Sequence, residues 1–358
     1  MAEDKRNIRI VDIARLAGVS PGTVDRVLHN RGKVSADKKE KIEQVLKEIN
    51  YRPNIIARSL AMKKHYTIAV LMPDFEKGSY WDGLHKGIEK AASELQSFNI
   101  DVEYIYFDQY NIDSFRKNAD RLLSNAYSGV LMSPLFKDPS IAISHKLDEQ
   151  EIPYAYIDSN ISGQNYLAYF GADAYNSGIL AAKLLLYEID SDSDILMVKA
   201  ASYNNDDSTQ TKAREKGFLD YMQKVNYTGR IHRVRIHLDS PDYPLAEISN
   251  ILKSGKVKGG IMFNSRIYVL ASLLYEKLKV HKNSVKLIGY DLIEKNIEAL
   301  KNNEVAFLLS QRSDMQGYNG IKALSNFLLF HDKTHIENYM PIDILVKENI
   351  DYYKNVNL

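Results

Sequence analysis

Four polar residues stand at the ends of short apolar runs, and their types suit the recognition of hydroxyl groups. Asp158 ends the run IPYAYID, Asn264 ends GGIMFN, Asp291 ends KLIGYD, and Gln311 follows AFLLS. A carboxylate or a side-chain amide can bond two neighbouring hydroxyls of a polyol. Two carboxylates can also serve as the acid and the base of a glycosidase. These residues therefore fit either a binding site or a catalytic site.

Sequence motifs that would favour catalysis are scarce. The chain has nine histidines and no cysteine, and it contains no HExxH zinc motif and no GxxxxGK[ST] phosphate loop. The lack of cysteine also excludes disulfides and thiolate metal sites. We therefore expect no catalytic residues, no cofactor and no metal site, and a sugar-processing enzyme is the less favoured alternative.

The apolar runs belong to a repeating pattern that starts at Thr67. Short segments rich in β-branched and aromatic residues alternate with amphipathic stretches, which is typical of parallel sheets covered by helices. Ten such strands suggest two doubly wound lobes, with ligands outside the carboxyl ends of the strands. The predicted strands are TIAVLM, VEYIYF, GVLMS, PYAYID, YLAYFG, DILMVK, RIHRVRI, GGIMFN, VKLIGYD and VAFLLSQ.

The N-terminal segment follows an all-helical pattern instead. Ile10, Ile13, Ala14 and Ala17 have the i, i+3, i+4, i+7 spacing of one helix face, and Gly18 ends that helix. A third helix is expected to start at Ser35. The remaining residues expected in this small core are Val24, Val27, Leu28, Ile42, Val45, Leu46 and Ile49.

A second helix is expected between these two, after a tight turn. Ser20 can cap it through its hydroxyl, and Pro21 can take the first helical position, where a missing N–H costs nothing. The outer face of this helix would meet base edges in the DNA major groove. The DNA-contacting residues predicted here are Ser20, Pro21, Gly22, Thr23, Asp25, Arg26 and His29.

The continuous pattern VDIARLAGVS...TV.RVL...G.VS......I......Y.PN..ARSLA resembles the lactose-repressor (LacI-type) family of bacterial transcription regulators. The resemblance implies a homodimer that binds a palindromic operator in double-stranded DNA and responds to a small-molecule effector. Asn54 can cap a short hinge helix, and Leu60 matches the leucine that wedges into the minor groove in this family. The hinge residues predicted to contact DNA are Asn54, Ala57, Arg58 and Leu60.

The chain departs from the family pattern on its second helix. Asp25 stands where relatives usually carry Ser, and Pro21 and Gly22 offer no side-chain hydrogen bonds to bases. Direct reading of the operator must therefore shift toward Asp25, Arg26 and His29. The operator sequence of relatives is not transferable to this chain.

The segment after the hinge resembles the sugar-binding periplasmic proteins of the ribose-binding type, which this family uses as an effector domain. The resemblance implies that the chain crosses between the lobes near Gly171, after Gln311 and around Lys333. Tyr80 and Trp81 follow the first strand, where aromatic rings either stack on a sugar face or pack in the core. The ligand-binding residues predicted in this way are Tyr80, Trp81, Asp158, Lys212, Asn264, Asp291 and Gln311.

The class of effector stays open between a sugar and a sugar acid. Ser159 follows Asp158 where the ribose-binding type usually has Arg, whereas Lys212 keeps a cation. Arg266 or Arg312 would add another cation if it faced the cleft. A purine or nucleoside is the alternative effector, and it would make Tyr80 and Trp81 base-stacking residues.

Charge is divided unevenly along the chain. Residues 1–65 carry a net charge of +7 and the remainder carries −6, so a basic segment suited to phosphates precedes an acidic body. No apolar stretch is long enough to span a membrane, and the N-terminus lacks a signal-peptide pattern, so we expect a cytoplasmic protein without a membrane partner.

The predicted fold is a small all-α helix-turn-helix headpiece plus an α/β, two-lobed, doubly wound domain like the periplasmic binding proteins. The predicted domains are a DNA-binding headpiece (1–53), a hinge helix and linker (54–65), and an effector-binding and dimerisation domain (66–358).

Overall fold

The structure of the chain is a computed structural model that describes residues 10–28, 32, 34–49, 64–201, 208–237, 244–331 and 335–353. The chain divides into two compact units, Met1–Lys64 and His65–Leu358. Neither unit has a described helix long and apolar enough to cross a membrane.

Three helices form the described part of the first unit, namely α1 (Ile10–Ala17), α2 (Pro21–Leu28) and α3 (Ala36–Glu48). Gly18 ends α1 in the left-handed conformation, with a φ of 65°. The Ser20 hydroxyl caps α2 as predicted, because it accepts a hydrogen bond from the Thr23 backbone N–H at 3.3 Å. The predicted core is also confirmed, with Ile13, Ala14, Ala17, Val24 and Ile42 buried and Ile10, Val27, Leu28, Val45, Leu46 and Ile49 packed against them.

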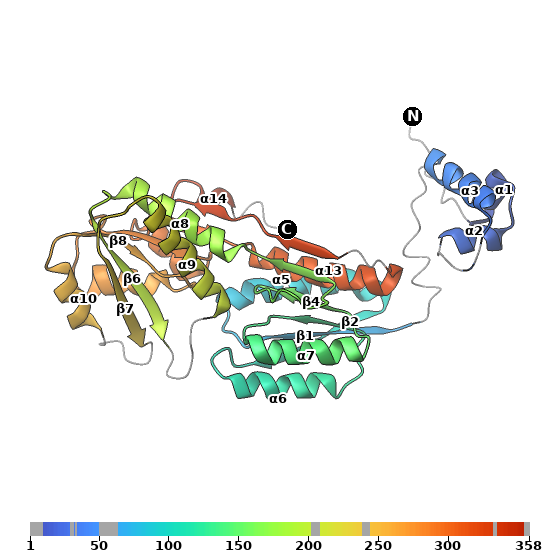
Figure 1. Cartoon of the computed structure of the whole chain (residues 1–358), viewed down its shortest axis with the longest axis horizontal. Helices are drawn as coiled ribbons and strands as arrows, with labels where there is room; N and C mark the ends of the chain where they lie inside the picture. Colours follow the sequence, from blue (N-terminus) through green and yellow to red (C-terminus); the bar gives the residue numbers. More distant parts are fainter. Residues whose placement is uncertain are drawn as a thin grey trace. The chain divides into compact units, whose positions relative to one another are not determined.

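The second unit contains two six-stranded sheets, one in each lobe (Figure 1). The first sheet has the order β11-β5-β4-β3-β1-β2, and all its neighbouring strands are parallel. Its strands are β1 (Tyr66–Pro73), β2 (Ile100–Phe107), β3 (Gly129–Met132), β4 (Tyr154–Ile157), β5 (Ala168–Gly171) and β11 (Ile336–Tyr339).

The sheet of the second lobe repeats this order as β12-β10-β9-β8-β6-β7. Its strands are parallel except for β12, which runs antiparallel to β10. They are β6 (Asp194–Ala201), β7 (Ile231–His237), β8 (Val257–Ile261), β9 (Lys286–Tyr290), β10 (Phe307–Ser310) and β12 (Asp343–Leu345).

Helices cover both faces of each sheet, as the continuous apolar strands require. In the first lobe, α5 and α13 bury one face of the sheet, and α6 and α7 bury the other, which Figure 1 shows as separate layers. A short 3-10 turn, η1 (Gln96–Phe98), follows α5. The helices of this lobe are α5 (Tyr80–Leu95), α6 (Ile112–Leu123), α7 (Lys137–Glu149) and α13 (Ser313–Phe330).

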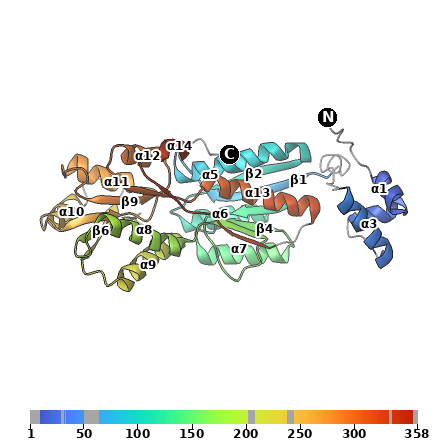
Figure 2. The ribbon, with the colours of Figure 1, turned by 90° about the horizontal axis from the view of Figure 1, so that it is seen from above.

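The second lobe has the same three layers (Figure 2). There α8 and α9 cover one face of the sheet, and α10, α11 and α12 cover the other. A π-helical turn, η2 (Ser272–Lys277), follows α11. The helices are α8 (Ala174–Glu188), α9 (Thr209–Lys224), α10 (Leu245–Leu252), α11 (Ile267–Ala271), α12 (Glu294–Lys301) and α14 (Ile350–Tyr353).

The ten strands predicted from the sequence are confirmed as β1 to β10. Strands β11 and β12 were not predicted, because they are short edge strands whose sequences, IENY and DIL, lack a clear apolar run. They also correct the predicted third crossing around Lys333, which itself lies outside the described residues. Strand β11 still pairs with β5 of the first sheet, and β12 pairs with β10 of the second, so the chain crosses between Tyr339 and Asp343. The other two crossings, after Gly171 and after Gln311, lie where they were predicted.

Candidate functional site

A cleft with a volume of about 1100 Å³ lies between the two lobes of the second unit. It is lined by the loops that follow the carboxyl ends of strands in both sheets, where doubly wound folds bind ligands. Every ligand-binding residue predicted from the sequence lines it, namely Tyr80, Trp81, Asp158, Lys212, Asn264, Asp291 and Gln311.

Asp158 and Asp291 occupy equivalent positions in the two lobes. Asp158 directly follows β4 and Asp291 directly follows β9, and these strands have the same place in the two sheet orders. Both residues have left-handed backbones, with φ angles of 66° and 69°. Such a conformation costs on the order of 1 to 3 kcal/mol for most residues other than glycine, and aspartate tolerates it better than most.

The Asp158 carboxylate is buried among hydrogen-bond donors. Its Oδ1 accepts from the Tyr80 hydroxyl at 2.6 Å, and its Oδ2 accepts from the Ser159 hydroxyl at 3.0 Å. Burial raises the pKa of Asp158, against the lowering effects of Tyr80 and Arg214. Burial also raises the pKa of Tyr80 well above its usual value, so the phenol stays a neutral donor.

The Asp291 carboxylate has a comparable environment in the second lobe. Its Oδ1 accepts from Nε2 of Gln311 at 2.8 Å, and Gln311 is held in turn by Gln316, whose Nε2 donates to the Gln311 carbonyl at 3.0 Å. Burial raises the pKa of Asp291 to about 6, although Arg214 and Gln311 oppose this shift. The site therefore contains a carboxyl group that titrates near neutral pH.

Arg214, on α9, is the buried cation of the cleft. It is 3% exposed, and the two carboxylates are 4% and 7% exposed. Its Nη1 donates to the Phe263 carbonyl at 2.7 Å, its Nη2 donates to Oε1 of Gln210 at 2.8 Å, and its guanidinium lies 4.3 Å from the centroid of the Tyr290 ring. These contacts fix the guanidinium where it lowers the pKa of both aspartates.

The approach of α9 to α8 sets the position of Arg214. A Cβ built on Gly178 would come 1.9 Å from the Arg214 carbonyl oxygen, and one built on Gly217 would come 2.0 Å from that of Tyr175. Only glycine permits this reciprocal close contact. The two helices are therefore packed backbone to backbone beside the cleft.

Three buried polar atoms of the cleft have no hydrogen-bond partner among the described residues. They are the Ser79 hydroxyl, Nε of Arg214 and Oε1 of Gln311. A buried polar group without a partner costs on the order of 1 to 3 kcal/mol. A ligand that supplies both donors and acceptors would satisfy them.

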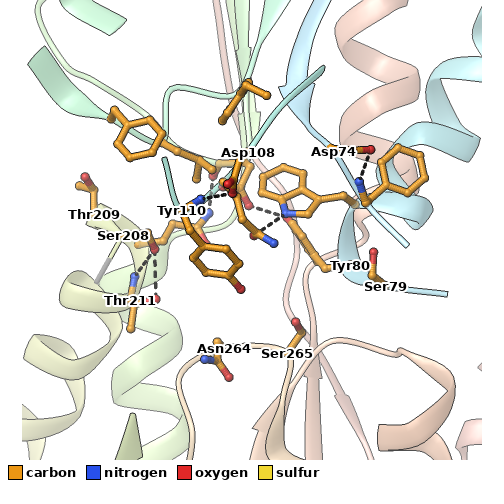
Figure 3. A pocket seen from close by; sticks show the side chains of 18 of the residues that line it. Asp74, Ser79, Tyr80, Asp108, Tyr110, Ser208, Thr209, Thr211, Asn264 and Ser265 are labelled. Carbon is orange, nitrogen blue, oxygen red and sulfur yellow. Dashed lines mark hydrogen bonds between the residues drawn. The ribbon is translucent and has the colours of Figure 1, made fainter. Parts of the chain in front are cut away.

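Hydrogen bonds between described residues join the lobes at the base and at the mouth of the cleft. At its base, Nε2 of Gln210 donates to the carbonyl of Asp158. At its mouth, Nη2 of Arg266 donates to the Tyr110 hydroxyl at 2.7 Å. Figure 3 shows the Tyr110 ring between the loops of the two lobes, with Asn264 and Ser265 on the facing side.

The cations considered in the sequence analysis lie in different places. Lys212 lines the cleft but is exposed, and Arg266 lines its mouth. Arg312 turns away and pairs with Asp343, at 2.7 and 2.9 Å. The Trp81 indole is buried, and its N–H donates to Gln109 at 3.1 Å. The described residues contain no cluster of three or more histidine or carboxylate side chains that could hold a metal ion.

In the first unit, the outer surface of α2 carries most of the predicted DNA contacts. Ser20, Pro21, Gly22 and Arg26 are exposed, whereas Thr23 and Asp25 are half-buried. The predicted hinge helix lies outside the described residues. The other predicted contacts also lie outside them, namely His29, Asn54, Ala57, Arg58 and Leu60.

Comparison with known proteins matches both units. Residues 9–54 match the family described as bacterial regulatory proteins, lacI family, and residues 68–331 match the periplasmic binding protein domain. A crystal structure from Bacteroides fragilis, described as a LacI transcriptional regulator, superposes with a TM-score of 0.75 and 35% sequence identity. The superposition covers 81% of this chain and 100% of the Bacteroides fragilis chain. The chain belongs to the LacI family.

Two curated relatives place the LacI-family chain among regulators. Catabolite control protein A of Staphylococcus aureus is 43% identical over 93 residues, which are 26% of this chain and 28% of that protein. The sucrose operon repressor of Pediococcus pentosaceus is 25% identical over 289 residues, which are 79% of this chain and 82% of that protein. Both relatives are named as regulators, which agrees with the expectation that the chain is not an enzyme.

Arg214 and Gln210, the buried polar residues of α9 in the cleft of this LacI-family chain, were not predicted from the sequence. The spacing of residues along α9 could have indicated them. Gln210, Arg214, Gly217 and Phe218 have the i, i+4, i+7, i+8 spacing of one helix face, and all four are buried. Lys212 lies about 200° around the helix from Gln210, given 3.6 residues per turn, and so belongs to the opposite face.

Proposed function

We propose that this LacI-family protein is a transcription regulator whose affinity for an operator is set by a sugar bound in the cleft. The observation that carries the proposal is the pair of equivalent carboxylates, Asp158 and Asp291, with the Arg214 guanidinium held near both. Carboxylates, amides and a guanidinium together satisfy the mixed donors and acceptors of a polyhydroxylated ring. The name of the sucrose operon repressor supports the same class of ligand.

The charges of the cleft favour a neutral sugar over a sugar acid. Its described lining contains six acidic and five basic side chains. The only cation among the fully buried residues of this lining is Arg214, against the two aspartates. A carboxylate ligand would meet a surplus of negative charge there, which costs free energy in a buried site.

The buried Trp81 indole gives little support to a purine or nucleoside. A base that stacks needs an open aromatic face, and Trp81 is buried with its N–H bound to Gln109. The Tyr80 hydroxyl is likewise bound to Asp158. Tyr80 supports a carboxylate of the cleft, and Trp81 supports the Gln109 amide.

DNA binding is assigned to the exposed face of α2, in the homodimer that a palindromic operator requires. The basic charge of residues 1–65 suits the phosphate backbone. Ligand binding would bias the arrangement of the two lobes through the Gln210 and Arg266 hydrogen bonds that join them. A change in lobe arrangement is the kind of two-state element that can couple two sites. A regulator that binds operator DNA in this way would act in the cytoplasm.

The proposal is tested with the full chain in two steps. A thermal-shift screen compares neutral sugars, uronates, purines and nucleosides, because a ligand at about 100 times its Kd stabilises a protein by about 2.7 kcal/mol. Operator fragments selected from random DNA are then titrated with and without the stabilising ligand.

We expect neutral sugars to stabilise the protein and to change its operator affinity. Stabilisation by purines or nucleosides alone would refute the sugar assignment. Stabilisation by uronates alone, lost in Lys212→Met, would refute the neutral-sugar assignment. A sugar that binds but leaves operator affinity unchanged would refute the regulatory role.

A further inference from the structure

The cleft is larger than a single sugar ring needs. Pockets that enclose drug-sized ligands have volumes of about 300 to 1000 Å³, and a monosaccharide is smaller than such ligands. The cleft has a volume of about 1100 Å³. Its buried charged side chains, Asp158, Asp291 and Arg214, occupy only one part of this space.

Separated lobes do not account for this volume. The Gln210 side chain already bonds the Asp158 carbonyl at the base of the cleft. The Arg266 guanidinium already bonds the Tyr110 hydroxyl at its mouth. The volume is therefore present while the two lobes are in direct contact across the cleft.

The outer part of the cleft is lined by aromatic side chains as well as charged ones. Tyr106 and Tyr110 are exposed although they are large and largely apolar, and both line the cleft together with the half-buried Phe75 and Phe136. Tyr106 lies at the end of β2, and its ring is 5.9 Å from that of Phe75. Tyr110 follows in the next loop, so the two exposed tyrosines belong to one stretch of chain at the mouth.

Exposed aromatic rings beside a polar site suit a second sugar unit. A sugar ring has an apolar face of C–H groups, which packs on an aromatic face while its hydroxyls stay in water. The exposed surfaces of Tyr106 and Tyr110 would lose contact with water in this way, which is favourable. Tyr104 stacks with the Tyr106 ring, and the Arg266 guanidinium lies 5.9 Å from the centroid of the Tyr110 ring. A monosaccharide bound to Asp158 and Asp291 would leave the remaining exposed surface of both rings in water.

We propose that the effector is a neutral disaccharide or longer oligosaccharide, with one unit bound by Asp158, Asp291 and Arg214 and the next stacked on Tyr106 and Tyr110. This inference rests on the proposed sugar-responsive function. It assigns a specificity role to two tyrosines that the sequence analysis did not select.

The test compares affinities for matched sugars in the full chain by calorimetry. The probes are glucose, fructose and galactose, and the disaccharides sucrose, maltose, cellobiose and lactose. We expect at least one disaccharide to bind at least tenfold more tightly than each of its own monosaccharides. Equal or weaker binding of every disaccharide, with a monosaccharide that does bind, would overturn this inference and leave the proposed function standing.

Variants then locate the second subsite. Tyr106→Leu should reduce the preference for the disaccharide at least threefold and leave monosaccharide affinity within twofold, which also shows that the variant is folded. Tyr110→Leu should reduce the preference at least threefold relative to Tyr110→Phe, which lacks the same hydrogen bond to Arg266. Tyr110→Phe keeps the ring and should keep the preference. Tyr187→Leu removes an exposed tyrosine of α8 that does not line the cleft and serves as the matched control.

Two results would overturn the assignment of the rings. One is a disaccharide preference that survives both leucine variants. The other is a preference that is lost in Tyr110→Phe, since the hydrogen bond to Arg266 would then be responsible. If no sugar of either length binds, the sugar-responsive function fails, and this inference fails with it.

Discussion

Asp158 and Asp291 occupy equivalent positions in the two lobes, and the same backbone pairing holds each of them. The Asp158 backbone N–H donates to the carbonyl of Phe170 on β5 at 3.1 Å, and that of Asp291 donates to Leu309 on β10 at 2.9 Å. Each strand thus extends its ladder by one residue and then turns with a positive φ, which aims the carboxylate into the cleft. A ligand between the lobes would meet one carboxylate from each.

The first prediction concerns these two carboxylates. Asp158→Asn and Asp291→Asn keep a residue that tolerates the left-handed backbone but remove the charge. Hydrogen bonds to a charged group contribute about 1.5 to 3 kcal/mol, so each variant should bind the effector about 10 to 100 times more weakly. Titration of operator DNA should show that the effector no longer changes DNA affinity, while affinity without effector is unchanged.

The matched control for this experiment is Asp120→Asn, which alters an exposed aspartate of α6. Its effector response should equal that of the unaltered protein. A full response in either cleft variant would show that the carboxylate does not contact the effector.

The second prediction is a pH dependence of effector binding. The pKa of Asp291 is about 6 in the ligand-free protein, and effector hydroxyls that donate to its carboxylate would lower it. Binding then releases a proton, so affinity rises as the pH increases from 5 to 7, and each unit of lowering contributes up to tenfold. Calorimetry over this range measures the effect.

Asp291→Asn should flatten this pH profile, because the asparagine does not titrate. The folding stability of the effector-free protein should depend on pH in the opposite direction. A carboxyl group with a raised pKa in the folded state favours folding at low pH, and this contribution is lost as the pH rises through about 6. An effector affinity that is constant from pH 5 to 7 would show that Asp291 keeps its protonation state on binding.

The third prediction separates the roles of Arg214 and Lys212 on α9. Arg214→Met leaves two buried carboxylates without their cation and should lower the free energy of unfolding by about 3 kcal/mol. Lys212→Met alters an exposed side chain and should change it by less than about 0.5 kcal/mol. The single tryptophan, Trp81, lies in the second unit and reports its urea unfolding by fluorescence. Equal stability of the two variants would contradict the role given to Arg214.

The fourth prediction concerns DNA recognition by α2. Arg26 is exposed on this helix, and we expect it to bond a guanine in each half-site. Arg26→Ala should then cost about 1 to 3 kcal/mol per half-site and relax the preference at one base position. Affinities for a set of operator variants measure both the loss of binding free energy and the change in base preference. An equal loss of affinity on every sequence would instead identify a phosphate contact.

Asp25→Ser provides a comparison on the same helix. The half-buried Asp25 carboxylate should repel the DNA backbone, so the variant is expected to bind nonspecific DNA more tightly at low salt. Unchanged nonspecific binding would show that this carboxylate has no effect on the DNA phosphates.

Local sequence patterns were sufficient to predict most elements of both units. The apolar spacing of Ile13, Ala14 and Ala17 gave the buried face of α1, because a helix of that composition has only one apolar side to bury. The ten main strands were equally clear, since a strand covered by helices on both faces must be apolar along its whole length. Asp158 and Asp291 could be placed because a polar residue that ends such a strand lies at the ligand-binding edge of the sheet.

The tertiary structure decided which cation of α9 is buried in the cleft, where β11 and β12 pair, and which side chains join the lobes. Lys212 and Arg214 are two residues apart, and only the packing of α9 on α8 through Gly178 and Gly217 turns Arg214 inward. The Arg266–Tyr110 hydrogen bond joins residues 156 positions apart. The sequence determines what each segment can bury, because that depends on spacing within the segment. Contacts between distant segments depend on how several packed layers fit together, which no single stretch of the chain records.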